Sequence, residues 1–289
     1  MEEQNSLTDL CGQKMKAGCN LMMSKFSMEE IRRSEVPKGS LTTWPLGQAS
    51  FMIKSPAGVV VALDPYLTNA CKAGGERLGM NFDRLTPPPL LPQDLAGIDL
   101  YLLTHSHGDH LDPETLSGYR EAGGEGPYIG PPETAEMLVE LGVPENQVTM
   151  TWPNRKHTIG DLNVQATFAI PNSGNDLTHV GYLLSVDGGP TFYYTGDTGY
   201  EDILGISAAP HNPDVLLTVI NGTFRNMGPV EAALLTKQLD PEVVIPYHHN
   251  LFPDTQVPVH VFRTNLCHFD LQNKLRTPKI GQPFTFPEA

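Results

Sequence analysis

Short apolar runs that alternate with helical patterns place the strongest constraint on the fold of this chain. The apolar runs are long enough for buried strands, and turn residues such as those at 56–58 separate them. Proline in a first turn and apolar residues at helical spacing predict helices between the runs. We expect strands near 51–53, 59–63, 98–103, 164–170, 182–186, 191–195, 215–219 and 243–247, and helices near 113–122, 131–141 and 228–239. This order predicts an α/β fold, sandwich-like, with its helices outside.

The length of 289 residues allows one large domain. Residues 1–36 are polar and rich in methionine, so we expect a poorly ordered or appended leader there, followed by a single domain over 37–289. Met22, Met23 and Met28 are each a candidate for an alternative start, and whether residues 1–27 belong to the native start stays open. The connection over 68–95 is long and rich in Gly and Pro, which predicts either a functional cover or a solvated loop.

An excess of acidic residues narrows the classes of partner. The chain has 33 Asp and Glu against 19 Lys and Arg, a formal net charge of −14, which disfavours nucleic acids and anionic membranes as partners. No apolar run reaches the length of a membrane span. The acidic N-terminus lacks the apolar core of a signal peptide, and four scattered cysteines suit a reducing compartment. We therefore expect a cytoplasmic protein that acts on a small molecule.

Metal-ligating side chains are concentrated in the segment 104–110, with the sequence THSHGDH, which follows the apolar run at 98–103. His105 and His107 are two residues apart, so on an extended backbone they face the same way. Asp109 and His110 on the following turn can face a second position close by. Imidazole and carboxylate ligands without a thiolate suit Zn, Mn or Fe. The segment therefore predicts a site for one or two divalent ions.

Two later strand ends each add a candidate ligand. Asp197 follows the run at 191–195, and His248 follows the run at 243–247. Ligands in α/β proteins gather outside the carboxyl ends of strands, so we expect both side chains to approach the histidine segment. Asp197 could then bridge two ions, and His248 could complete the second.

Taken together, these motifs resemble the metallo-β-lactamase superfamily and, within it, the L-ascorbate-6-phosphate lactonase family, whose relatives include a phosphodiesterase that cleaves N-acyl-phosphatidylethanolamines. The resemblance covers residues 40–255 and includes, besides the histidine segment, the stretches WPLG at 44–47, LDPY at 63–66, LTPPP at 85–89, YTGD at 194–197, ING at 220–222, MGP at 227–229 and VIPYHH at 244–249. It implies an αβ/βα sandwich of two mixed sheets flanked by helices. The lactonase resemblance also implies a homo-oligomer.

The resemblance assigns metal ligands by position. It implies that His105 and His107 bind a first ion, and that Asp109, His110 and His248 bind a second. Asp197 would bridge the two ions. Members with a complete two-metal site supply another histidine from the strand before the Gly-Asp-Thr motif. Here the corresponding segment 169–174 has none, and Asn172 or His179 are the candidates to replace it.

The activity implied is hydrolysis of a small lactone or ester by a metal-bound hydroxide, with a phosphorylated sugar lactone such as L-ascorbate 6-phosphate as one candidate substrate. Asp109 is expected to orient the hydroxide as well as to bind metal, and His249 to contact a substrate oxygen. Asn221 and Arg225 are expected to bind an anionic substrate, because a guanidinium holds phosphate well. Two alternatives stay open: a metal-dependent phosphodiesterase that acts on an N-acyl-phosphatidylethanolamine or a nucleotide, and a non-catalytic binding protein on the same fold.

Overall fold

Two mixed β-sheets form the centre of the computed structural model, which describes residues 26–171 and 177–288. The first sheet has the strand order β13 (Phe284–Phe286), β1 (Leu41–Gly47), β2 (Ser50–Lys54), β3 (Val60–Leu63), β4 (Leu100–Leu102), β5 (Tyr128–Gly130) and β6 (Val148–Met150). The second has the order β12 (Val243–Tyr247), β11 (Val215–Val219), β10 (Thr191–Tyr194), β9 (His179–Val186), β8 (Leu162–Ala169) and β7 (Lys156–Ile159). In both sheets a parallel part adjoins an antiparallel part, β3 to β6 in the first and β10 to β12 in the second.

The main apolar core lies between the two sheets. Side chains of a strand alternate between its two faces, and the first sheet follows this period closely. On β4, Leu100 and Leu102 pack into the core shared with the second sheet, whereas Tyr101 packs into a separate core on the outer face. Both faces of the strand are fully buried. This explains why the sequence shows an unbroken apolar run rather than an alternating one.

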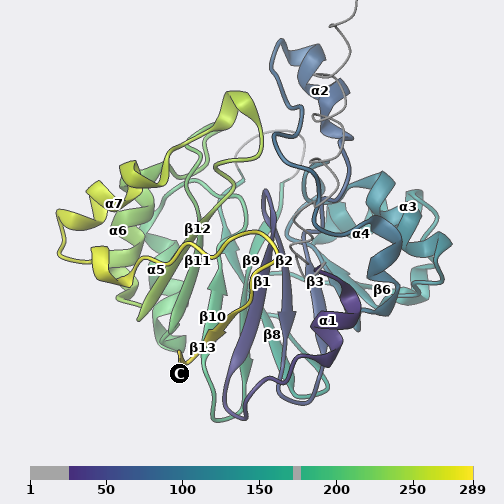
Figure 1. Ribbon diagram of the computed structural model, residues 1–289, viewed down its shortest axis with the longest axis horizontal. Helices are drawn as coiled ribbons and strands as arrows, with labels where there is room; N and C mark the ends of the chain where they lie inside the picture. The colour runs from purple at the N-terminus through teal and green to yellow at the C-terminus, as the bar shows by residue number, and fades with distance from the viewer. Residues whose placement is uncertain (1–25, 172–176, 289) are drawn as a thin grey trace, which may run out of the picture.

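Helices cover the outer faces of both sheets (Figure 1). On the side of the first sheet lie α1 (Met28–Arg33), α3 (Pro113–Glu121) and α4 (Pro132–Glu140), and on the side of the second lie α5 (Asp202–Ala208), α6 (Pro229–Leu239) and α7 (Val259–Cys267). The start of α3 is fixed by Asp112, whose carboxylate accepts from the Glu114 N–H, and by Pro113 in the first turn. The predicted sandwich of two mixed sheets flanked by helices is confirmed. No helix within the described ranges is long and apolar enough to cross a membrane.

The connection over 68–95 differs from the expected irregular loop. It contains α2 (Cys71–Leu78), which stands above the edge of the sheets (Figure 1). The sequence does not predict this helix, because Gly74 and Gly75 lie inside it and glycine has low helix propensity. It also has too few apolar residues to show an amphipathic pattern. Gly75 is needed for packing, since a Cβ at this position would lie 2.9 Å from the Phe82 ring. Close contact with a neighbouring segment therefore outweighs the low helix propensity of glycine.

The packed region begins earlier than the predicted leader boundary at residue 36. Residues 1–25 lie outside the described residues, but α1 packs Met28 and Ile31 into the outer core of the first sheet. The ammonium group of Lys54 on β2 donates to three carbonyls at the end of this helix, Ile31 O at 2.9 Å, Arg32 O at 2.7 Å and Ser34 O at 2.7 Å. These bonds satisfy carbonyls that have no partner within the helix.

Replacing Lys54 with Met should lower the free energy of unfolding by about 2 kcal/mol, because three charge-assisted hydrogen bonds are lost at a site that is largely shielded from water. Urea denaturation followed by circular dichroism measures this loss. Lys72→Met is the matched control, since Lys72 forms an exposed ion pair with Asp83 and such pairs contribute little. Equal losses in the two variants would show that Lys54 does not anchor α1.

Candidate metal centre

Four strand ends from the two sheets deliver histidine and aspartate side chains to one edge of the sandwich. The segment after β4 carries His105, His107, Asp109 and His110. Asp197 follows β10, His248 follows β12, and His179 is the first residue of β9. All of these side chains are buried or half-buried. The structure thus brings together the six ligands predicted from the sequence and adds His179 to them.

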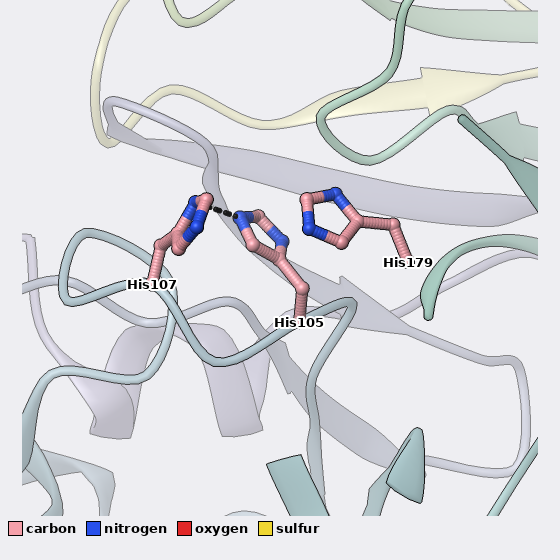
Figure 2. Close-up of side chains that lie close together, drawn as sticks. All are labelled: His105, His107 and His179. Carbon is pink, nitrogen blue, oxygen red and sulfur yellow. Dashed lines mark hydrogen bonds between the residues drawn. The ribbon is translucent and has the colours of Figure 1, made fainter. Parts of the chain in front are cut away.

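Three imidazoles form the first group of the cluster, and Figure 2 shows them in a row with His105 in the middle. His105 Nε2 lies 3.0 Å from His107 Nδ1. The ring of His105 stacks on that of His179, with centroids 4.1 Å apart. Each of the three rings offers one nitrogen, and these nitrogens lie within 4.8 Å of one another. This group therefore supplies the three nitrogen ligands of a candidate metal position.

Asp109, His110 and His248 form the second group. His248 Nε2 lies 3.0 Å from Asp109 Oδ2. Asp197 is close to the second group, since its Oδ1 is 3.5 Å from His110 Nε2 and its Oδ2 is 3.4 Å from His248 Nε2. It also forms a candidate group with His105 and His110. Asp197 therefore has neighbours in both groups, and its role as a bridge between two ions stays a prediction.

Unusual backbone at two positions lets the strand ends approach each other. His248 has φ of 58°, in the left-handed region, and its N–H donates to Gln48 O at 2.9 Å. Gly196 has φ of 64°, and a Cβ there would lie 2.6 Å from Val180 O. Only glycine allows this close approach of the segment after β10 to β9. Asp197 and His179 are brought to the same place as a consequence.

The ionisable side chains of the cluster shift one another's pKa. Burial opposes ionisation of Asp109 and Asp197, but the neighbouring His110 and His248 outweigh it and hold the pKa of both carboxyls below the usual range. Burial disfavours protonation of His110 and His248 as well, but the carboxylates raise the pKa of both imidazoles. Burial and the neighbouring imidazoles lower the pKa of His105. Positive charge is therefore favoured beside the two carboxylates, whereas His105 is kept neutral, as a metal ligand must be.

The donor set fits a divalent metal ion. His110 Nε2 is buried, yet it lies 3.5 Å from Asp197 Oδ1 and 3.9 Å from Asp109 Oδ2, longer than ordinary hydrogen bonds. Ligand atoms about 2.1 Å from a tetrahedral ion are roughly 3.4 Å from one another, so separations of this size leave room for an ion. Imidazole nitrogens and carboxylate oxygens are the ligands of zinc, manganese and iron.

Asp64 orients the cluster, and no pattern of metal-ligating residues in the sequence singled it out. Its buried carboxylate lies 2.8 Å from His110 Nδ1 and accepts from the Thr104 N–H at 2.8 Å and the Thr104 hydroxyl at 2.7 Å. A carboxylate on the distal nitrogen fixes the ring and raises its basicity as a ligand. The signal that could have found it is an aspartate directly after a fully apolar strand, β3.

Gln48 and Asn221 support the second group. Gln48 Nε2 donates to Asp109 Oδ2 at 2.9 Å and lies 3.2 Å from His248 Nε2. Asn221, which was expected to bind substrate, is buried, and its amide nitrogen lies 3.0 Å from His248 Nδ1. Asn221 therefore contacts a candidate ligand rather than the cavity, and holds the orientation of its ring.

A cavity of about 450 Å³ adjoins the cluster, lined on one side by His107, Asp109, Asp197 and His248. Two residues expected at the substrate do not line it. Arg225 is exposed in its loop. His249 turns the other way, with Nδ1 3.1 Å from Val257 O, and lines a second cavity beside Tyr247. Asn172, the other candidate for the missing ligand, lies outside the described residues.

The fold and the cluster together define a metal-dependent hydrolase of the metallo-β-lactamase class. Residues 62–249 match the family model described as a Beta-lactamase superfamily domain. The chain belongs to this superfamily. It is 30% identical over 257 residues to a UPF0173 metal-dependent hydrolase of Thermodesulfovibrio yellowstonii, a match that covers 83% of this chain and 90% of the relative.

A second relative has a more specific name. The chain is 26% identical over 266 residues to the "Probable L-ascorbate-6-phosphate lactonase UlaG" of Salmonella paratyphi B, with 79% of this chain and 75% of the relative covered. Among solved structures, Igni18, a metallo hydrolase of Ignicoccus hospitalis, has a TM-score of 0.69 at 24% identity and covers 86% of this chain and all of its own. An isothiocyanate hydrolase from Delia radicum gut bacteria has a TM-score of 0.69 at 17% identity, covering 84% of this chain and 98% of its own. These structures support the fold.

Replacing His179 with Ala should lower the metal bound per chain by about one ion, because the first group would keep only two of its three nitrogen ligands. Equilibrium dialysis against zinc or manganese followed by elemental analysis measures the content. The matched control is His157→Ala, since His157 lies on β7 and contacts Thr151, away from the cluster. If both variants retain the metal content of the parent, His179 is not a ligand.

Proposed function

We propose that this hydrolase opens a small lactone or cleaves a small ester. The observation that carries the proposal is the position of Asp109. Its side chain is 19% exposed, lines the cavity, and is held in place by Gln48 and His248 within the candidate second group. A carboxylate at this position can contact both a candidate ion and a molecule in the cavity. The cavity of about 450 Å³ has the size of a site for one small molecule.

In this proposal His105, His107 and His179 would hold one divalent ion, and Asp109, His110 and His248 a second, with Asp197 shared between them. A divalent ion in such a site lowers the pKa of a bound water and polarises the carbonyl that is attacked. Asp109, kept ionised by its neighbours, accepts the proton of the attacking water and returns it to the leaving alkoxide. His110 is held by Asp64, and His248 by Asn221, so the two rings keep their orientation during the reaction.

The charges around the cavity favour a carbonyl substrate over a phosphodiester. Arg77 is the single Lys or Arg among the described residues that line the cavity, and the lining includes the two carboxylates Asp109 and Asp197. A phosphodiester carries a permanent negative charge, and apart from the candidate ions the described lining offers it only Arg77, whereas a lactone or simple ester is neutral and needs no cationic side chain. The similarity to the named lactonase supports the same choice.

The substitution Asp109→Asn should lower kcat/KM for a lactone at least ~100-fold, because the amide cannot accept the proton of the attacking water. The assay uses protein stripped with a chelator and reloaded with zinc or manganese, with δ-valerolactone and L-ascorbate 6-phosphate as substrates. Metal content is measured in parallel, so that loss of metal is separated from loss of the proton acceptor. The control Asp83→Asn alters an exposed carboxylate that pairs with Lys72 and should keep full activity.

Two results would contradict the proposal. One is hydrolysis of lactones and esters by the stripped protein at the rate of the reloaded protein. The other is hydrolysis of a phosphodiester such as bis(4-nitrophenyl) phosphate by the reloaded protein, together with no hydrolysis of any lactone or carboxylic ester.

A further inference from the structure

Large apolar side chains form one part of the cavity wall, beside the cluster. It is formed by Leu78 at the end of α2, by Phe82, by Phe224 in the segment between β11 and α6, and by Phe252 after β12. Leu78 is 65% exposed and Phe224 is 40% exposed, although both are large apolar side chains. Large apolar groups exposed at the mouth of a polar site are typical of a ligand-binding surface.

The aromatic side chains of this wall hold one another in place. The rings of Phe82 and Phe252 are stacked with centroids 5.1 Å apart, and Phe224 meets Phe82 edge-on at 6.1 Å. The ring of Tyr66 also meets that of Phe252 edge-on, with centroids 5.8 Å apart. Such ring pairs are favourable and restrict side-chain rotation. The aromatic part of the wall is therefore held in place by its own contacts, without a bound substrate.

Apart from the candidate metal cluster, the described lining of the cavity lacks the features of a phosphate site. Phosphate recognition depends on converging guanidinium, ammonium or backbone N–H groups. Arg77 on α2 is the one cationic side chain that the described lining provides, and Arg225, which the sequence suggested for this role, is exposed and outside the lining. The carboxylates of Asp109 and Asp197 line the same cavity.

We infer that the substrate is a neutral lactone or ester with an alkyl or aryl substituent, which packs against Leu78, Phe82 and Phe224 while the carbonyl faces the cluster. The inference rests on the proposed function and narrows its substrate class. In the reaction water adds to the carbonyl carbon and the bond to the ring or ester oxygen breaks. A hydroxy acid, or an acid and an alcohol, is the product, with no change in oxidation state.

The test compares δ-valerolactone with δ-decalactone, which differs by a pentyl substituent, in the metal-loaded protein. The pentyl group should raise kcat/KM by ~30-fold or more, because about half of its apolar surface would leave water. A readout independent of catalysis is the affinity for the corresponding lactams, which are not hydrolysed in the assay, measured by calorimetry. The pentyl-substituted lactam should bind more tightly than δ-valerolactam by a similar factor.

Substitutions in the wall should remove this preference. Phe224→Ala, and the double variant Leu78→Ala with Phe224→Ala, should reduce the advantage of the pentyl group to about threefold or less in both readouts. Ile206→Ala is the matched control, since Ile206 is 61% exposed on α5 and does not line the cavity. The single variant keeps the test decisive if the double variant disturbs α2.

The outcomes separate this inference from the proposed function. Hydrolysis of δ-valerolactone with no pentyl advantage in rate or affinity overturns the inference and leaves the proposed function standing. Tight binding of the pentyl lactam without hydrolysis of any lactone or ester supports the apolar wall as a binding surface and contradicts the proposed function. A preference for L-ascorbate 6-phosphate that disappears in Arg77→Gln would overturn the inference by showing that charge selects the substrate.

Discussion

The buried carboxylate of Asp64 is the contact on which the architecture of the site depends. It accepts from the Thr104 N–H and hydroxyl at the start of the histidine segment, lies 2.8 Å from His110 Nδ1, and accepts from Tyr194 OH at 3.0 Å. Tyr194 belongs to the second sheet, whereas Asp64 follows β3 of the first. One carboxylate therefore links both sheets to a candidate ligand. A buried charge is costly unless it is fully hydrogen-bonded, and these partners meet that condition.

The histidine segment was predictable because its information is local. His105 to His110 fall within six residues after an apolar strand, so their proximity follows from chain connectivity alone. Asp197 and His248 followed from the general position of ligands at strand ends. His179 was only one of two candidates for the missing histidine, because the strand was expected to start at residue 182 and instead starts at His179, where pairing with Ala169 continues the ladder to the edge of the sheet.

The residues assigned to the substrate were harder to place, for a different physical reason. His248 and His249 are neighbours in sequence, but they lie in a bend in which His248 has φ of 58°, and only His248 reaches the cluster. The amide of Asn221 can hydrogen-bond to a metal-binding side chain or to a substrate equally well. Its contact with His248 depends on the packing between β11 and β12. The place of Arg225 depends on a loop with backbone in the left-handed region, which no pattern in the sequence encodes.

The two walls of the cavity belong to different parts of the packing. The ligand cluster is continuous with the sheets and shares their core, whereas Tyr66, Leu251 and Phe252, with Cys71 and Phe82 packed against them, form a small apolar cluster of their own. Of the apolar residues that line the cavity, Leu78 and Phe224 are exposed, so they can change at little cost to the free energy of unfolding, whereas Phe252 is buried. The exposed part of the wall, to which we assign substrate selection, can therefore vary independently of the reactive groups. In such an arrangement the chemistry follows from the superfamily, and the substrate must be deduced from the wall that the superfamily motifs do not contain.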